Sequence, residues 1–465
     1  MTEILLIQPK LEMHASPPLG LAYIAAVLEK NGITVKIVDL NQRRHKDNPI
    51  FRLNNILQEE RPKLVGISCL TSYYMEAREI AELVKKYNED IKVVMGGVHP
   101  SSLPELTLQD NNVDFVVMGE GELTTLDLFT NLKTEENYES VDGLGFKRRG
   151  KTIINKPRKL IEDLDSLPFP SWHLIPPSEY PPSPQGFFLK KYPVAPIITS
   201  RGCPYACTFC ASNNFWRGRW RARSPENVIS EIQMLIEQYG VKEFEILDDN
   251  FTLDRKRASK ICDELIKSNF NVSWSCSNGI RADRLDRELI RKMRKAGCHQ
   301  VSFGIESTSQ KILNRIQKNI TIGQIKRAIK ISKEEGLTVG GFFIFGLPYE
   351  TRNTALKMIK LAKKLDLDWA QFHIFTPLPG STEFLNWVRK QGIEESNLDF
   401  SKFNILRGVI SGYETDVNLE ELRKLKNRAF FEFYLRPHIL VNFLKRMKIS
   451  QLPWLFKRIF TQFIG

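Results

Sequence analysis

No stretch of this chain approaches the roughly 18 uninterrupted apolar residues that a membrane-spanning helix needs. The 465 residues also contain no low-complexity tract and no repeat of solenoid type, which argues against disordered and repeat architectures. The start of the chain, residues 1–9, lacks the basic region and the long apolar core of a signal peptide. We therefore expect a cytoplasmic protein of two or three folded domains.

Cysteine is scarce, with seven residues in the chain. They are too few and too unevenly spaced for a disulfide framework. Three of them, Cys203, Cys207 and Cys210, fall within eight residues, and the other four are scattered singly. Clustered thiols in a cytosolic chain more often bind a metal than pair with each other.

Acidic residues are in deficit, with 54 Asp and Glu against 67 Lys and Arg and a formal net charge of +13. The basic excess is spread along the chain, so we expect no nucleic-acid partner. The exception is the segment 433–465, which has six Lys or Arg residues and no acidic residue.

The first 135 residues alternate buried-strand and helix patterns, which predicts a doubly wound parallel sheet. In such sheets ligands bind outside the carboxyl ends of the strands. Here these ends carry short polar or glycine-rich turns, including 96–100 and 119–122. The expected strands are residues 4–7, 35–38, 64–67, 93–95 and 115–118.

A small hairpin at 143–156 and a proline-dense stretch follow. Ten prolines lie between Pro157 and Pro196, a density that defeats helices and central strands. We interpret the stretch as a linker that packs through Phe169, Trp172, Phe187 and Phe188.

From residue 196 onward six further strand patterns alternate with helices. Six β/α units predict a partial barrel, two units short of a full (β/α)8 barrel. The expected strands are residues 197–199, 244–247, 272–276, 300–305, 339–345 and 370–375. The expected parts are an N-terminal domain at 1–140, a hairpin and linker at 141–194, a barrel at 195–410 and a helical tail at 411–465.

The cysteine cluster predicts a particular kind of metal site. Three thiolates on one loop can hold three corners of a cubane iron–sulfur cluster and leave the fourth iron open, whereas fully ligated clusters use four cysteines. The alternative is a structural zinc site with a distant fourth ligand.

The spacing Cys-x3-Cys-x2-Cys after the first strand of a six-unit barrel resembles the radical S-adenosylmethionine (SAM) superfamily. With the preceding sheet domain, residues 1–400 resemble its cobalamin-binding subclass, which includes the magnesium-protoporphyrin monomethyl ester cyclase type and class B methyltransferases. The resemblance implies a [4Fe–4S] cluster on the three cysteines, SAM on the open iron, and reductive cleavage of SAM to a 5′-deoxyadenosyl radical.

The same resemblance implies a SAM site. Phe209 is similar to the residue beside the adenine, and Asp248 and Asp249 occupy the place where the family holds the SAM amino group. Glu306 resembles a polar SAM contact, and the segment ending at Gly346 resembles the strand that passes the adenine. The purely structural alternatives are that the acidic residues only cap the following helices and that the glycine-bearing strand is only part of the core.

The N-terminal domain resembles a cobalamin-binding domain through segments that include Gly96, Gly97 and Gly119. It has no Asp-x-His-x-x-Gly signature for a histidine cobalt ligand: His45 is wrongly spaced from Asp39, and we place His99 on a loop as a turn residue. Cobalamin held without a histidine and a vestigial or substrate-binding domain both remain open.

We therefore expect an enzyme that methylates an unactivated carbon. Radical cyclisation or rearrangement of a lipid-like or tetrapyrrole-like substrate is the alternative, and a zinc-dependent binding module without catalysis is the alternative of another class. RNA methylthiolation is disfavoured, because only Cys69 precedes Cys203 where a second cluster domain would need three cysteines. The expected partners are a small-molecule or lipid-like substrate and an electron donor such as a flavodoxin or ferredoxin.

The tail predicts a membrane contact. In residues 454–464 apolar pairs alternate with polar pairs at helical spacing. Basic residues on one face with Trp and Phe on the other suit a helix in a membrane interface. Peripheral contact through 437–465, on the inner face of the membrane, and docking of the tail on the barrel are both open.

Overall fold

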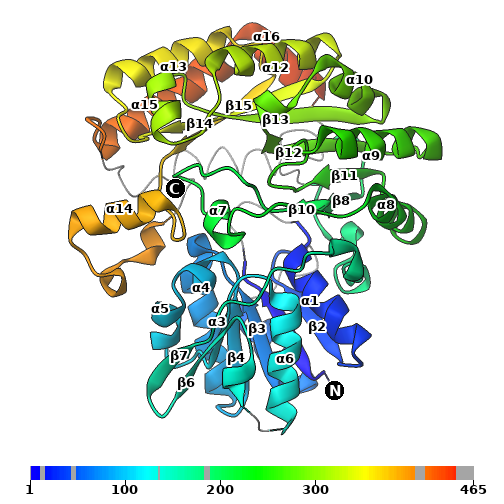
Figure 1. The fold of residues 1–465 in the computed structure, drawn as a ribbon, viewed down its shortest axis with the longest axis vertical. Coiled ribbons are helices and arrows are strands. Elements are labelled where there is room, and N and C mark those ends of the chain that lie inside the picture. The colour runs from blue at the N-terminus through cyan, green and yellow to red at the C-terminus, as the bar shows by residue number, and fades with distance from the viewer. Residues whose placement is uncertain are drawn as a thin grey trace. The chain divides into compact units, whose positions relative to one another are not determined.

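The computed structural model describes residues 2–10, 16–42, 49–134, 137–182, 189–403 and 414–446. The chain forms two compact α/β units (Figure 1). The first comprises Met1–Pro181, Asn214–Arg217 and Leu378–Ser401, and the second comprises Pro182–Asn213, Gly218–Pro377 and Lys402–Gly465.

The first unit is built on a seven-stranded sheet with the strand order β2-β1-β3-β4-β5-β6-β7. The first five strands along the chain are parallel and confirm the predicted doubly wound sheet. They are β1 (Ile4–Gln8), β2 (Val35–Asp39), β3 (Leu64–Ser68), β4 (Lys92–Gly96) and β5 (Phe115–Val117).

The predicted hairpin forms, but it belongs to this sheet and not to the linker. Strands β6 (Leu144–Arg148) and β7 (Lys151–Ile154) are antiparallel and extend the sheet beyond β5. The reason is apolar burial, because Leu144 and Phe146 are both buried and a free hairpin would leave them in water.

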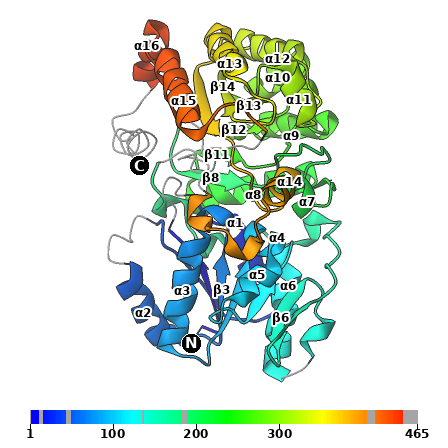
Figure 2. The same cartoon turned by 90° about the vertical axis from the view of Figure 1, so that its left-hand side faces the viewer.

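Helices cover both faces of the first sheet, as Figure 2 shows. In the strand order, β2 lies on one side of β1, and β3, β4 and β5 follow on the other side. Because crossover connections are right-handed, this reversal of direction places helices on opposite faces of the sheet. Accordingly α1 packs on α6, and α2 packs on α3. The helices are α1 (Leu19–Lys30), α2 (Pro49–Glu60), α3 (Tyr74–Tyr87), α4 (Val98–Ser102), α5 (Pro104–Gln109) and α6 (Gly121–Thr134); α14 (Thr382–Gln391) also belongs to this unit.

The proline-dense stretch packs on the first unit as far as Pro181. Trp172 and Tyr180 are both 1% exposed. The backbone N–H of Ser171 donates to the Ala22 carbonyl at 3.1 Å, and the Tyr180 hydroxyl donates to Asp39 at 2.8 Å. Phe187 and Phe188, which we expected in the same contact, lie outside the described residues.

The second unit contains a six-stranded parallel sheet in sequential order, which confirms the predicted series of β/α units. The strands are β8 (Val194–Ile197), β11 (Glu243–Ile246), β12 (Ser273–Ile280), β13 (Cys298–Glu306), β14 (Thr338–Phe345) and β15 (Trp369–Ile374). The helices are α8 (Pro225–Tyr239), α9 (Arg255–Ser268), α10 (Arg287–Lys295), α11 (Gln310–Arg315), α12 (Ile322–Glu334), α13 (Arg352–Lys364), α15 (Leu419–Tyr434) and α16 (Pro437–Arg446).

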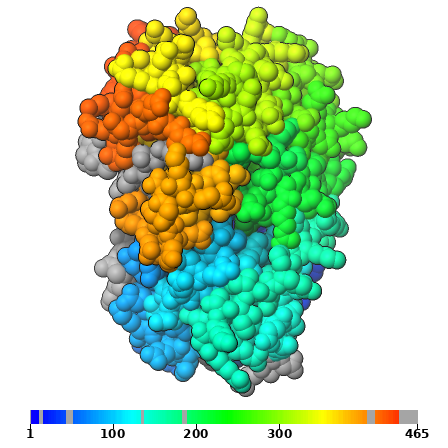
Figure 3. Space-filling model, turned by 60° about the vertical axis from the view of Figure 1, so that its left-hand side comes forward, coloured from blue at the N-terminus to red at the C-terminus, as the bar shows by residue number. Residues whose placement is uncertain are grey.

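The two faces of this sheet differ in polarity. On the helix-covered face Phe343 stacks on Phe372 at 5.2 Å between ring centroids, and Phe372 meets Phe433 of α15 at 6.1 Å. The space-filling view shows α13 in yellow and α15 in orange-red on the surface of the molecule (Figure 3). The other face is mixed: it carries Phe342, Ile344 and Trp369 together with seven polar residues, which are Glu245, Ser275, Ser277, Gln300, Ser302, Gln371 and His373.

Hydrogen bonds connect several of these inner-face side chains. Ser277 Oγ donates to Glu245 at 3.3 Å, and Gln300 Nε2 donates to Ser277 Oγ at 3.2 Å. An inner face that combines apolar side chains with several polar groups suits a sheet that binds a ligand on that face. In the described part of the chain, no helix is long and apolar enough to cross a membrane.

Candidate cluster and cofactor site

The three clustered cysteines lie on a loop that a short antiparallel ribbon closes. After β8, strand β9 (Ser200–Arg201) pairs with β10 (Arg221–Ala222) and brings the two flanks of the cysteine segment together. Cys203, Cys207 and Cys210 are partly exposed on this loop, whereas the other four cysteines are buried. Only the three clustered thiols are therefore open to a metal.

Opposing electrostatic effects act on these thiols. Burial raises the pKa of all three, that of Cys210 to about 11. Two cations oppose this effect: Arg281 lowers the pKa of Cys203 and Cys207, and Lys318 lowers the pKa of Cys207 and Cys210. Burial is the larger effect, so the net pKa shift of all three thiols is upward, and the two cations only reduce it.

The donor set fits an iron–sulfur cluster. Three thiols without a nearby fourth are the soft ligands that iron–sulfur clusters use. Among the described residues, no three His, Cys, Asp or Glu side chains converge closely enough to hold a single metal ion. A cubane separates its ligating thiolates more widely than one ion does, so these observations are compatible.

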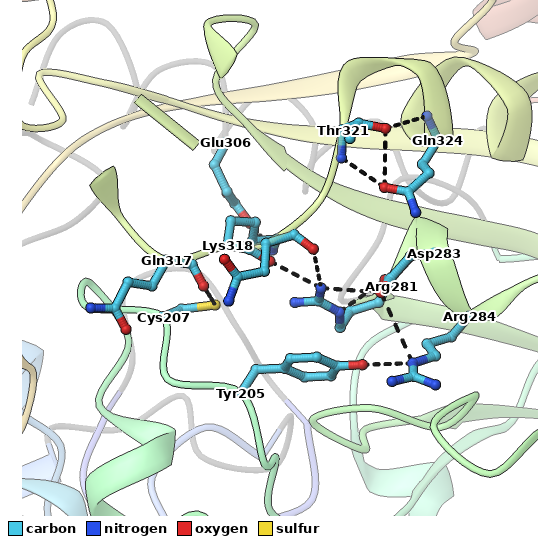
Figure 4. Close-up of polar contacts among 11 residues, drawn as sticks. Tyr205, Cys207, Arg281, Asp283, Arg284, Glu306, Gln317, Lys318, Thr321 and Gln324 are labelled. Carbon is cyan, nitrogen blue, oxygen red and sulfur yellow. Dashed lines mark hydrogen bonds and ion pairs between the residues drawn. The ribbon is translucent and has the colours of Figure 1, made fainter. Parts of the chain in front are cut away.

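The cysteine loop is attached to the turn between α11 and α12, as Figure 4 shows. The Thr208 N–H donates to the Ile316 carbonyl at 3.0 Å, and the Cys207 thiol lies 3.8 Å from the Gln317 carbonyl. This turn also carries Lys318, so the loop and the cation are held on the same support.

Glu306 and Lys318 form a buried ion pair at the end of β13. Lys318 Nζ lies 2.7 Å from Glu306 Oε1, and both residues are less than 10% exposed. A Cβ at Gly304 would lie 2.4 Å from that carboxylate oxygen and 2.8 Å from Nζ, so a larger residue there would displace the two side-chain ends and disturb the pair. Burial lowers the pKa of Lys318, but the neighbouring Glu306 carboxylate outweighs burial and raises it overall.

The two candidate aspartates have different environments. Asp248 is 2% exposed and accepts hydrogen bonds from Thr199 N, Thr199 Oγ1 and Ser200 Oγ, each at 2.6 Å. Its oxygens are thus occupied in holding the corner between β8 and β9. Asp249 is exposed and accepts from the Gly202 N–H at 3.1 Å, directly before Cys203.

Two other predicted SAM contacts are also located. Phe209 is partly buried, and its ring centroid lies 5.8 Å from Lys318 Nζ. Gly346 follows β14 with a φ of +82°, and its Cβ would lie 2.8 Å from Leu422 of α15. The positive φ favours glycine here, and the Leu422 side chain would have to move to admit a larger residue.

The three glycines predicted for cobalamin lie in the first unit, at the carboxyl ends of β4 and β5. A Cβ at Gly97 (φ +116°) would lie 2.5 Å from the Cys69 carbonyl, so Gly97 is required by a backbone contact of the fold itself. A Cβ added at Gly96 would make only ordinary van der Waals contacts, and a Cβ added at Gly119 (φ +74°) would have no atom within 4 Å. Gly119 is thus the position where the fold leaves space beside the backbone.

His99 is not on a loop, as we had placed it, but in helix α4. It is fully buried, its ring stacks on Tyr74 at 4.0 Å, and Phe400 meets it edge-on at 4.8 Å. Its Nδ1 lies 3.2 Å from Thr71 Oγ1. Burial lowers the pKa of His99 to about 3. The aromatic contacts explain its position as a packed residue. His45, the other histidine weighed, lies outside the described residues.

Arg281 and Lys318 were not anticipated from the sequence. Arg281 follows β12, and its guanidinium lies 3.5 Å from the centroid of the Tyr205 ring in the cysteine loop. Both are charged residues just beyond strand or helix ends, where ligand-facing groups gather in α/β folds. Their position after a strand or a helix was therefore the sequence feature from which these two site residues could have been predicted.

Two family models match the chain. The radical SAM superfamily matches residues 197–362, and the B12 binding domain matches residues 12–129. The chain is 38% identical to an uncharacterized methyltransferase of Pyrococcus horikoshii, over 92% of this chain and 89% of the relative. It is 30% identical to an anaerobic magnesium-protoporphyrin IX monomethyl ester cyclase of Rubrivivax gelatinosus, over 90% of this chain and 75% of the relative.

The chain belongs to the cobalamin-binding radical SAM family. It is therefore an enzyme, and its cofactors are a [4Fe–4S] cluster, SAM and cobalamin. Membership of this enzyme family excludes the non-catalytic zinc module, and the B12 binding domain match decides against a vestigial first domain.

The fold of this cobalamin-binding radical SAM enzyme matches a solved structure. The cobalamin-dependent radical enzyme OxsB, with aqua-cobalamin and SAM bound, superposes with a TM-score of 0.73 at 18% identity. The match covers 99% of this chain and 71% of OxsB. At that identity the comparison supports the shared fold alone.

Proposed function

We propose that this enzyme transfers a methyl group to an unactivated carbon of a small-molecule substrate. The main observation in support is the set of three partly exposed cysteines, because three thiolates leave one iron of a cubane cluster open for SAM. The 38% identical relative, itself named a methyltransferase, supports this reaction class.

In this proposal Cys203, Cys207 and Cys210 hold the cluster, and the residues around them hold SAM. Asp249 is the better candidate for the SAM amino group, because Asp248 already uses its oxygens within the fold. Glu306 contributes a polar contact, and Phe209 lies beside the adenine. Gly346 shapes the end of β14.

The cobalamin lies at the carboxyl ends of β4 and β5 in the first unit. Gly119 gives the ligand access to the backbone, and Gly96 and Gly97 shape the preceding turn. His99 is not a cobalt ligand, because its ring is enclosed by Tyr74 and Phe400. When bound, the cofactors supply a 5′-deoxyadenosyl radical that takes a hydrogen from the substrate and a methyl group that replaces it.

Replacement of the ligands tests the cluster. Cys203→Ala, Cys207→Ala and Cys210→Ala should each abolish formation of 5′-deoxyadenosine from SAM under reducing anaerobic conditions. Cys262→Ala is the matched control, because Cys262 is a buried cysteine of the same unit. Iron and sulfide analysis accompanies each assay. A triple-alanine enzyme that still produced 5′-deoxyadenosine would refute the assignment.

Radical cyclisation is the second candidate, because the Rubrivivax relative is named a cyclase. The two reactions differ in the fate of the SAM methyl group. Methylation carries an isotopically labelled methyl group from SAM into the product, whereas cyclisation does not. Product analysis with labelled SAM therefore separates them.

The partners follow from the same chemistry. A one-electron donor such as a flavodoxin or ferredoxin reduces the cluster. The polar groups on the inner face of the second sheet suit a substrate that carries hydrogen-bonding groups. A lipid-like substrate with a polar head group could bind there as well.

We also propose that the protein is cytoplasmic and contacts the inner face of the membrane through 437–465, since Leu440 and Val441 of α16 are 42% and 47% exposed.

A further inference from the structure

Arg281 is a buried cation beside the cysteine loop. The residue is 7% exposed and follows directly after β12. Its Nε donates to Asp283 Oδ1 at 2.9 Å and its Nη2 donates to Asp283 Oδ2 at 3.2 Å. Asp283 thus fixes the plane of the guanidinium.

The fixed guanidinium touches both segments that frame the cluster. One face lies 3.5 Å from the centroid of the Tyr205 ring, and Tyr205 stands between Cys203 and Cys207. Its Nη2 also donates to the carbonyls of Lys318 at 2.9 Å and Asn319 at 3.3 Å. Figure 4 shows Arg281 between Tyr205 and the Lys318 turn.

The contact is specific to arginine. A planar guanidinium can stack on an aromatic ring and donate in its own plane at the same time, which a lysine ammonium cannot do. A second arginine, Arg284, donates to the Tyr205 hydroxyl at 2.6 Å, but its side chain is 43% exposed. Arg281 is thus the buried member of the pair.

We propose that Arg281 is a positioning residue that clamps the cysteine loop onto the Lys318 turn and raises the midpoint potential of the cluster. The inference rests on the proposed ligation by Cys203, Cys207 and Cys210. Reduction adds one electron to the cluster. The guanidinium is ion-paired with Asp283, so replacing it by a neutral side chain removes a positive charge and leaves that carboxylate uncompensated, and both changes disfavour the more negative, reduced cluster. Cluster potentials depend on such charge, hydrogen bonding and solvent exposure.

The first test is a redox titration of the reconstituted holoenzyme followed by paramagnetic resonance. Arg281→Gln should lower the midpoint potential, with about a tenfold change in the reduction equilibrium, which is about 59 mV for one electron. The control is Arg287→Gln, which makes the same charge change at an exposed residue of α10 that pairs with Glu334 and Glu335. The control should keep the wild-type potential.

The second test separates the clamp from the charge. Arg281→Lys keeps a cation but loses the stack and the in-plane donors, so its potential should stay near wild type. Its cluster should nevertheless lose iron to a chelator several-fold faster. If Arg281→Gln assembles no cluster, iron loss from Arg281→Lys still tests the clamp, and Asp283→Asn tests the charge. Asp283→Asn removes the carboxylate that pairs with the guanidinium, so the midpoint potential should rise above wild type; an unchanged potential would contradict the charge effect.

The outcomes distinguish the two levels of inference. A wild-type enzyme that assembles no cluster overturns the proposed function and the role of Arg281 together. A wild-type cluster with normal SAM cleavage, combined with unchanged potential in Arg281→Gln and unchanged iron loss in Arg281→Lys, overturns the role of Arg281 alone.

Discussion

Single residues of one type have different tasks in this enzyme, and its glycines show this clearly. Gly97 is required by the fold, because a Cβ there would lie 2.5 Å from the Cys69 carbonyl oxygen. Gly346 and Gly119 have φ values of +82° and +74°, which favour glycine, but a Cβ at Gly119 would meet no atom within 4 Å. Open space beside the backbone, and not glycine alone, is therefore what makes a strand end a candidate for ligand contact.

Alanine substitutions at two of these glycines should separate the tasks. Gly97→Ala forces a Cβ against a backbone oxygen and should lower the free energy of unfolding by about 3 kcal/mol or more. Gly119→Ala has open space and should cost only about 1 kcal/mol of left-handed backbone strain. Denaturant unfolding of the cofactor-free protein measures both. Equal losses would contradict the assignment of Gly97 to the fold.

Glu350 offers a residue-scale test by pH. It is 1% exposed and accepts a hydrogen bond from the Gly346 N–H, and burial raises its pKa to about 8. The folded protein therefore holds this proton between about pH 4.5 and pH 8, whereas the unfolded chain releases it. Stability should fall as the pH rises through this window, by up to about 1.4 kcal/mol per pH unit.

The variant Glu350→Gln has no carboxyl group at this position, so its side chain does not ionise between pH 5 and pH 8. The difference in unfolding free energy between variant and wild type should therefore shift in favour of the variant from pH 5 to pH 8. Other titrating groups cancel in this difference. A difference that stays constant with pH would show that Glu350 is ionised in the folded enzyme.

At the scale of elements, the corner between β8 and β9 decides where the cysteine loop begins. Asp248 of the neighbouring strand end fixes this corner with three accepted hydrogen bonds. Arg223, after β10, adds a buried ion pair with Glu231 of α8. The base of the cysteine loop is thus held in place by buried hydrogen bonds and a buried ion pair.

Asparagine substitutions at the two adjacent aspartates should affect different properties: stability at Asp248 and SAM binding at Asp249. Asp248→Asn leaves buried donors poorly matched and should lower the unfolding free energy by about 2 kcal/mol or more. Asp249→Asn should cost less than about 1 kcal/mol but weaken SAM binding to the reconstituted enzyme. Thermal unfolding and calorimetric titration measure the two effects. Weaker SAM binding in a stable Asp248→Asn variant would reverse the assignment.

The elements and the cysteine loop could be predicted because their signals are local. Largely apolar runs of three to seven residues predicted both parallel sheets, and the three cysteines lie within one turn-rich segment. The surrounding cations could not be predicted in the same way, since Tyr205 and Arg284 are 79 positions apart and meet only through the order of the strands. The hairpin at 143–156 was assigned to the linker because its pattern does not show which sheet its buried face joins.

At the scale of the whole molecule, the charge of +13 is most uneven toward the end of the chain. Residues 437–465 carry five Lys or Arg residues and no acidic residue. Only residues up to Arg446 of this segment are described, so the predicted helical period at 454–464 lies beyond them. Attraction to anionic lipid adds about 1 kcal/mol for each basic residue near the surface.

Co-sedimentation with anionic phospholipid vesicles tests this membrane contact. The full-length protein should sediment with the vesicles and should be released by salt. A chain truncated after Arg436 should remain in the supernatant. Circular dichroism of the truncated chain checks that it is folded. Equal, salt-insensitive sedimentation of the two proteins would refute the contact.

The different polarities of the two faces of the second sheet have a consequence for substitutions in this enzyme. Stability resides in the aromatic packing under the helices, through residues such as Trp274, Phe343 and Phe372. The half-buried Gln371 and His373 lie on the opposite face. Substitutions of these two half-buried residues should therefore change what the inner face recognises while leaving the aromatic packing under the helices intact.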